Sequence, residues 1–173
     1  AWWEDLGNGL MVGAVAAVNA LGDVLDEEGN ILAGPRDPAT NKMLSTVLVW
    51  KNNWKNNTGQ DGLLIRYKLP AAKPLNGEEI MQNTTLAVVV TTARLTKEEV
   101  NKVAQVANTG LARCIEPAHT MYDGDTVFAM ATGKVPADVN LVGAVAARVL
   151  ETAVRRAVRA ALPAGGVPNY KLE

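Results

Sequence analysis

The stretch that decides the fold of this chain is NTTLAVVVTTARLTKEEV, residues 83–100. Within it, residues 84–92 form a β-branched and apolar run, TTLAVVVTT, which predicts a central β-strand. Thr96 then stands where a helix N-cap is expected, and Glu99 three residues later completes a capping box. The apolar stripe of that helix consists of Val100, Val103, Ala104, Ala107 and Leu111. A strand followed by an amphipathic helix is therefore predicted.

The sequence after this helix repeats the alternation of strand and helix. Residues 126–131, TVFAMA, predict a second strand, and residues 139–162 form a long helix rich in Ala, Val and Arg. Pro163 and the glycines that follow it end this helix. Strands combined with two amphipathic helices predict a layered α/β sandwich.

The sequence before residue 83 is of two kinds. Residues 10–25, LMVGAVAAVNALGDVL, are nearly continuously apolar, which suits a strand buried on both faces and then a turn, or a short buried helix. Residues 41–82 are polar and turn-rich and predict a surface excursion. Within that excursion, Trp50 and Trp54 are candidates for a partner or substrate surface, or for simple loop anchors.

Composition limits the classes of function. A chain of 173 residues with 48% apolar and 20% charged residues suits one ordinary globular domain. The net charge of −1 gives no general electrostatic case for nucleic acid or an anionic membrane. No apolar run reaches the roughly 18 residues of a membrane span, and the start does not resemble a signal peptide, so a cytoplasmic protein is expected. The single cysteine, Cys114, excludes an internal disulfide and is expected to be a buried thiol.

Thr84 is the residue with the most distinctive chemistry. A threonine hydroxyl needs a base to become a good nucleophile. If the peptide bond after Asn83 is cut, the freed α-amine of Thr84, with an unperturbed pKa of about 8, supplies that base on the same residue. The hydroxyl can make the cut itself by attacking the Asn83 carbonyl. Taken alone, however, Asn-Thr-Thr is also a glycosylation sequon, and β-branched pairs open many strands.

Two further features are compatible with this chemistry. Asp123 and Asp125 flank Gly124 just before the strand of residues 126–131, so their carboxylates could orient a hydroxyl and an ammonium. The alternative is a plain Asp-Gly turn. Asn19 lies in the most apolar run, where a buried amide must find partners. Its NH₂ group could stabilise an oxyanion, or it could make a local structural hydrogen bond.

Together these segments resemble a known family. The order NTTLAVVVT, a helix ending in LARCIEPAHT, and DGDTVFA resembles the self-processing aminopeptidases and amidases. That family includes D-aminopeptidases, β-peptidyl aminopeptidases and hydrolases of 6-aminohexanoate (nylon) oligomers, and the Asn-Thr junction with paired aspartates is most similar to the last group. VGAVAAVNALGDVLD resembles the family's strand that bears the oxyanion asparagine. The resemblance covers residues 11–34 and 83–133, and the final helix more loosely.

The resemblance implies a role for each of these residues. Thr84 would be the nucleophile released by cleavage after Asn83, Asn19 would help to hold the oxyanion, and Asp123 and Asp125 would orient Thr84. The fold would be the αββα sandwich of N-terminal-nucleophile hydrolases, with no cofactor. Residues 1–83 would end the α-subunit part and residues 84–173 would form the β-subunit part, together one domain. The substrate would be a short peptide, a β-peptide or an ω-amino-acid oligomer, and the assembly a homo-oligomer, a tetramer by resemblance.

One departure from the family accompanies the resemblance. Family members carry a long segment before the asparagine strand, with glycine-rich motifs and a further active-site lysine or tyrosine, and nothing here matches it. We therefore expect the chain to be the C-terminal half of a longer protein, with Trp2 and Trp3 packed against the other half. A metal site is not expected, because the single histidine, His119, has no partners at ligand spacing.

Two rival functions remain open on the sequence. One is acyl transfer of the ornithine acetyltransferase type, which also involves self-cleavage before a threonine; the DGDTVFA segment favours the amide hydrolases instead. The other is a non-catalytic assembly protein that keeps the fold without processing. The two differ in whether the chain is cut before Thr84.

Overall fold

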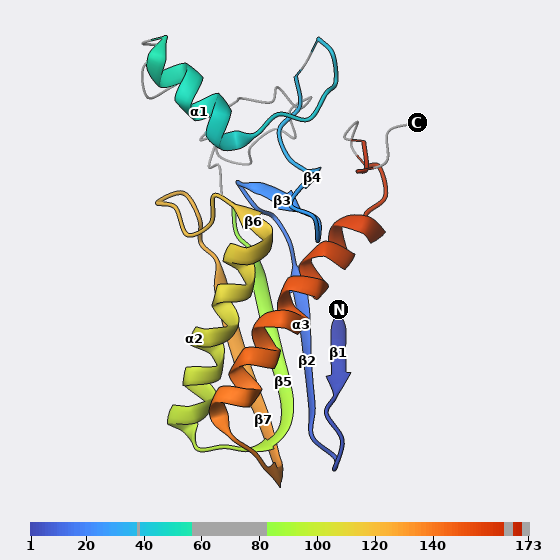
Figure 1. The fold of residues 1–173 in the computed structure, drawn as a ribbon, viewed down its shortest axis with the longest axis vertical. Helices are drawn as coiled ribbons and strands as arrows, with labels where there is room; N and C mark the ends of the chain where they lie inside the picture. Colours follow the sequence, from blue (N-terminus) through green and yellow to red (C-terminus); the bar gives the residue numbers. More distant parts are fainter. Residues whose placement is uncertain (38, 57–82, 165–167, 171–173) are drawn as a thin grey trace, which may run out of the picture.

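A computed structural model describes residues 1–37, 39–56, 83–164 and 168–170. The main sheet has four strands in the order β1-β2-β5-β7. Its strands are β1 (Trp2–Asp5), β2 (Met11–Ala17), β5 (Leu86–Arg94) and β7 (Thr126–Pro136). Strand β2 is antiparallel to β1 and β5, whereas β5 and β7 are parallel. The sheet is therefore mixed, as Figure 1 shows.

The parallel pair explains the position of the first long helix. Two parallel strands need a crossover connection, and here it contains α2 (Lys97–Cys114). Thr96 caps α2 and forms the predicted capping box with Glu99, so this sequence prediction is confirmed. The second long helix, α3 (Val139–Ala160), follows β7 and begins after the N-cap Asp138. Both helices lie on the same face of the main sheet (Figure 1).

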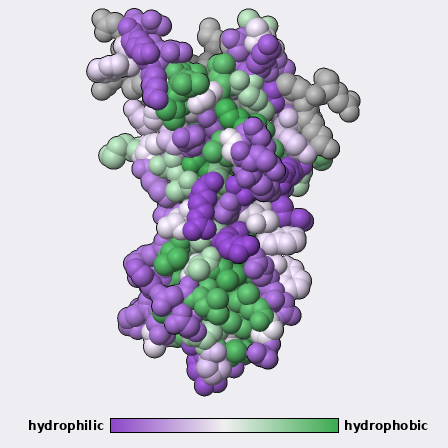
Figure 2. All heavy atoms as spheres, in the orientation of Figure 1, coloured by the Kyte–Doolittle hydropathy of each residue, from purple (hydrophilic) through white to green (hydrophobic). Residues whose placement is uncertain are grey.

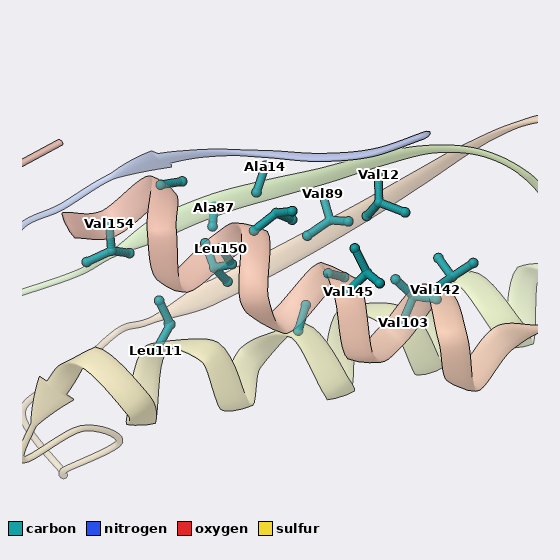
Figure 3. Close-up of a cluster of buried hydrophobic side chains, with 14 of the residues drawn as sticks. Val12, Ala14, Ala87, Val89, Val103, Leu111, Val142, Val145, Leu150 and Val154 are labelled. Atoms are coloured by element: carbon teal, nitrogen blue, oxygen red, sulfur yellow. The ribbon is translucent and has the colours of Figure 1, made fainter. Parts of the chain in front are cut away.

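The core lies between these helices and the sheet. Val12 of β2 and Val89 of β5 point from the sheet towards Leu111 of α2 and Leu150 of α3, and all four are fully buried. Figure 3 shows these side chains between the strands and the helices. The helices also approach each other closely, because a Cβ at Gly110 would lie 3.1 Å from the carbonyl carbon of Ala147. Only a glycine permits this backbone contact.

The opposite face of the main sheet is apolar and exposed. Side chains along a strand alternate between the two faces, so β5 buries Ala87 and Val89 and exposes Leu86 and Val90. The other exposed apolar residues of the same strands include Trp3, Met11, Val15, Phe128 and Met130. Figure 2 shows the helix-bearing side instead, where most visible side chains are hydrophilic and a hydrophobic patch lies at the lower end.

The predicted α/β fold is confirmed in this arrangement. The described residues supply one helix layer and one main sheet of the four layers in an αββα sandwich. They also form a small sheet in the order β4-β3-β6, from β4 (Ile31–Ala33), β3 (Asp23–Leu25) and β6 (Ile115–Glu116). Within the described part of the chain, no helix is long and apolar enough to cross a membrane.

One sequence expectation is wrong, and one helix was not expected. Residues 10–25 do form the predicted strand, β2, followed by a turn before β3, but β2 buries one face and not both. The apolar residues of the open face made the run look doubly buried. The excursion of residues 41–82 contains a helix, α1 (Thr46–Lys55), whose Trp54 is 83% exposed and so does not anchor a loop. Residues 57–82 lie outside the described residues.

A buried carboxylate attaches α1 to the small sheet. Asp23 at the start of β3 accepts hydrogen bonds from the backbone N–H of Thr46, at 3.1 and 2.9 Å, and from its hydroxyl. Burial raises the pKa of Asp23, and the hydrogen bonds from Thr46 oppose that rise. An acid side chain at the first turn of a helix also satisfies a free N–H group and suits the helix dipole.

Candidate active site

The topology brings the predicted site residues to one edge of the main sheet. Because β2 is antiparallel to β5, the end of β2 lies beside the start of β5. Because β7 is parallel to β5, the start of β7 lies there too, on the other side of β5. Asn19 follows β2, Thr84 precedes β5, and Asp123 and Asp125 precede β7. Segments that are far apart in sequence thus meet at the upper end of the sheet in Figure 1.

Thr84 is half-buried and lies two residues before β5. Its neighbour Asn83 pairs with Asp123 in an isolated parallel bridge, which extends the β5–β7 ladder to the Asn83-Thr84 bond. The Thr84 hydroxyl lies against Gly124, since a Cβ at position 124 would be only 2.7 Å from Oγ1. The side-chain nitrogen of Asn83 is buried without a hydrogen-bond partner among the described residues. The Asn83-Thr84 bond is therefore held on a fixed backbone next to the acidic turn.

Asp125 binds the residue after Thr84. Its Oδ1 accepts a 2.6 Å hydrogen bond from the backbone N–H of Thr85, which is fully buried. Burial raises the pKa of Asp125, and the nearby charge of Asp123 raises it further. The hydrogen bond from the Thr85 N–H and the proximity of His119 act in the opposite direction. Asp125 thus fixes the backbone at the start of β5.

Asp123 stabilises the turn itself. Its Oδ2 accepts a 2.8 Å hydrogen bond from the backbone N–H of Thr120, and its own N–H donates to the Thr120 carbonyl at 3.2 Å. The hydroxyl of Thr120 accepts in turn from the N–H of Tyr122. These bonds close the loop from residue 120 to residue 123 and set the direction in which the chain enters β7. The two aspartates therefore hold different parts of the same edge.

Asn19 is exposed, which corrects the expectation that it is a buried amide. It lies just beyond β2, where the chain leaves the sheet, between the half-buried residues Val18 and Ala20. The last pair of the β2–β5 ladder is Ala17 with Leu86. Continuing that register by two residues would set Asn19 opposite Thr84, and opposed residues in an antiparallel ladder have Cα atoms about 5 Å apart.

The contacts made by three residues of this edge could not be predicted from the sequence. Gly124 contacts Thr84, Thr85 binds Asp125, and Gly22 packs on the loop before the acidic turn. A Cβ at Gly22 would collide with the carbonyl oxygen of Pro117 and lie 2.8 Å from the carbonyl carbon of Glu116. Only the glycine in Asp-Gly-Asp was visible as a turn signal, because close backbone approach leaves no mark in one sequence.

His119 and Cys114 also lie near this edge of the sheet. His119 is exposed and adopts a left-handed backbone conformation with φ of 58°. Cys114 is fully buried at the end of α2, as expected, and burial raises the pKa of its thiol to about 12, so it is unreactive. Among the described residues, no group of three or more His, Cys, Asp and Glu side chains could hold a metal ion.

Comparison with known proteins finds relatives named as aminopeptidases and as a 6-aminohexanoate-oligomer endohydrolase. An uncharacterized aminopeptidase of Mycobacterium tuberculosis is 35% identical over 181 residues, which cover 96% of this chain and 48% of the relative. A similarly named protein of Mycobacterium leprae is 35% identical over 188 residues, 95% of this chain and 45% of the relative. The 6-aminohexanoate-oligomer endohydrolase of Kocuria sp. is 26% identical over 159 residues, 84% of this chain and 40% of the relative.

This chain therefore spans about half the length of the curated relatives it matches. The family model of peptidase family S58 matches residues 4–171, which include both the β2 end and the Asn83-Thr84 junction. The match also agrees with the resemblance inferred from the motifs. The chain belongs to peptidase family S58.

Proposed function

We propose that this chain carries the active site of a self-processing amide hydrolase in which Thr84 is the N-terminal nucleophile. The observation that carries this proposal is the contact of the Thr84 hydroxyl with Gly124, at the sheet edge that also receives Asn19 and the two aspartates. Membership of a peptidase family and the names of the relatives favour hydrolysis of amide bonds.

The proposed reaction has two stages. In the first, the Thr84 hydroxyl attacks the Asn83 carbonyl, and water opens the resulting ester to leave Thr84 with a free amine. In the second, this amine accepts the proton of the hydroxyl, which attacks a substrate amide and forms an acyl-enzyme ester. The protonated amine then donates its proton to the leaving amine, and water releases the acyl group.

Each of the other residues has a proposed part. Asp125 would fix the backbone at Thr85 and, once the chain is cut, lie close enough to favour the ammonium form of the new terminus. Asp123 would fix the turn that carries Gly124. Asn19 would donate its side-chain N–H to the oxyanion of the substrate reaction.

The substrate would be a short peptide, a β-peptide or an oligomer of an ω-amino acid such as 6-aminohexanoate. The exposed apolar face of the main sheet would pack against another part of a longer protein, and that part would complete the pocket and supply a further lysine or tyrosine. A homo-oligomeric, cytoplasmic enzyme without a cofactor remains our prediction.

The test is mass spectrometry of the purified full-length protein together with a panel of amide substrates. We expect a fragment that begins at Thr84 and turnover of peptide anilides or 6-aminohexanoate oligomers. A chain that stays whole and inactive would favour the non-catalytic assembly protein. Cleavage without hydrolysis, but with acyl transfer to an added amine such as ornithine, would favour the acyltransferase.

A further inference from the structure

The carbonyl that self-cleavage would attack already accepts a hydrogen bond. The backbone N–H of Gly124 donates to the carbonyl oxygen of Asn83 at 3.0 Å. We propose that this N–H is the donor that stabilises the oxyanion during self-cleavage. This role rests on the proposed function and adds a residue to it, because Asn19 was assigned to the oxyanion of the substrate reaction.

The same residue also makes room for the nucleophile. The Thr84 Oγ1 atom lies only 2.7 Å from where a Cβ of residue 124 would be. A side chain there would displace the hydroxyl, whereas glycine lets the backbone approach both the hydroxyl and the Asn83 carbonyl. Gly124 therefore contacts both reacting groups, the attacking Oγ1 and the oxygen that becomes negative.

The N–H of Gly124 is fixed in place by its neighbours. On one side, Asp123 is bound to Thr120 by two hydrogen bonds. On the other side, the N–H of Thr126 donates to the Thr85 carbonyl at 3.0 Å, and the Thr126 hydroxyl donates to the Gly124 carbonyl at 3.1 Å. A donor that is already oriented stabilises developing charge without reorganisation, which is the basis of oxyanion holes.

Self-cleavage begins when the hydroxyl attacks the carbonyl. A bond forms between the Thr84 Oγ1 and the Asn83 carbonyl carbon, and the carbonyl electrons move onto the Asn83 oxygen, where the Gly124 N–H holds the charge. The tetrahedral intermediate collapses by breaking the bond to the Thr84 nitrogen, which receives the hydroxyl proton and becomes an amine. Water then hydrolyses the ester to a carboxylic acid at Asn83 and the free Thr84 hydroxyl.

The test replaces one backbone amide by an ester. Cell-free translation of the full-length protein with glycolic acid at position 124 removes the N–H and adds no side chain. The matched control places the α-hydroxy analogue of threonine at position 126, which removes the N–H that bonds the Thr85 carbonyl at the same 3.0 Å. Each change removes one hydrogen bond between the starts of β5 and β7. Only the N–H removed at position 124 donates to the carbonyl of the scissile bond.

We expect the ester at 124 to slow cleavage before Thr84 by about 100-fold or more, the usual effect of losing an oxyanion donor, and the ester at 126 to stay within a few-fold of the unmodified protein. Equal slowing by the two esters, or normal cleavage with the ester at 124, would overturn the assignment of Gly124 and leave self-processing intact. An unmodified protein that is never cut would overturn the proposed function itself.

A second measurement covers the case in which the ester at 124 fails to fold. In the uncut Thr84→Ala protein with ¹³C at the Asn83 carbonyl, the carbonyl stretch reports the hydrogen bond directly. Exchange of the Gly124 amide for deuterium should shift this stretch. Exchange of the Thr126 amide should not. A stretch that is insensitive to deuterium at Gly124 would contradict the proposal.

Discussion

The backbone N–H of Thr85 donates a 2.6 Å hydrogen bond to Oδ1 of Asp125, although the two residues are 40 positions apart in sequence. This bond joins the start of β5 to the start of β7, between the isolated Asn83–Asp123 bridge and the first ladder pair, Leu86 with Thr126. It thus sets the backbone immediately after Thr84.

Replacement of Asp125 by Asn keeps an oxygen that can accept from Thr85 but removes the negative charge. We expect kcat to fall by far more than the roughly 1 kcal/mol change in stability that such a surface-turn change typically brings. Asp123→Asn should show the same pattern, through the turn that Asp123 fixes. Kinetics on a peptide anilide, with urea denaturation as the control for folding, would measure both. Normal kcat in either folded variant would assign that aspartate to the turn alone.

The raised pKa of Asp125 makes the free energy of unfolding depend on pH in a defined direction. The folded protein keeps a proton on Asp125 at pH values where the unfolded chain, with a pKa near 3.8, has released it. The stabilisation that the protonated Asp125 gives to the folded protein is fully present below pH 3.8 and is lost as the pH rises through the folded-state pKa. In Asp125→Asn this part of the pH dependence should vanish, as seen in denaturation curves collected from pH 3 upwards. An unchanged pH dependence would contradict the assignment.

Replacements at Thr84 distinguish the role of its hydroxyl in cleavage from any role of the residue in folding. Thr84→Ala should abolish cleavage after Asn83, because no hydroxyl remains to attack. Thr84→Ser should restore cleavage at a lower rate, since the hydroxyl returns without the methyl group that restricts its rotamers. N-terminal sequencing of both proteins provides the measurement. A cut before residue 84 in the alanine variant would show that the nucleophile lies elsewhere.

Gly22 should control how the Asn19 loop meets the acidic turn. A methyl group at position 22 would collide with the Pro117 carbonyl, so Gly22→Ala should cost about 1–3 kcal/mol of stability and slow cleavage. The control is Gly29→Ala, whose Cβ would meet nothing within 4 Å but whose φ of 85° imposes a comparable strain. The cleavage rates of the two variants are compared at the same fraction of folded protein. Equal rates would show that Gly22 has no specific effect on the site.

Asn19→Ala should slow acylation by about 100-fold or more if its side chain donates to the oxyanion. Asn140→Ala, at an exposed position in the first turn of α3, is the control for loss of an amide. Burst kinetics with an activated ester or anilide would isolate the acylation step. An experimental structure of the full-length protein with the Asn19 amide turned away from Thr84 would refute this role.

Arg159 should hold Glu27 ionised at acid pH. Its guanidinium hydrogen-bonds both carboxylate oxygens of Glu27 and lowers the pKa of Glu27 to about 2. Arg159→Ala should return this pKa towards 4.5, which NMR titration of the Glu27 carboxyl carbon would detect. The stabilisation is present above pH 4.5 and lost as the pH falls through about 2, and it should be small because the pair is exposed. An unshifted titration would show that Arg159 is not the cause.

Local patterns in the sequence were sufficient to predict the central strand and the two long helices. The strand now seen as β5, the capping box of α2 and the extent of α3 each follow from neighbouring residues, because propensity, capping and periodicity are local. The helix α1 was not predicted within the polar excursion, since the polar composition of this segment masks a helix that is capped by Ser45 and attached through Asp23. That attachment joins residues 23 positions apart and has no local signal.

The sequence by itself determined the family motifs, the alternation of long strands and helices after residue 83, and Thr84, Asn19, Asp123 and Asp125 as candidates. Only the tertiary structure decided how they are arranged: Asp125 binds Thr85, Asp123 closes its own turn, and Gly124 faces both Thr84 and the Asn83 carbonyl. The reason is physical. Backbone hydrogen bonds and close glycine contacts depend on the register between strands, and register is fixed by packing across the whole sheet rather than by the residues that form the site.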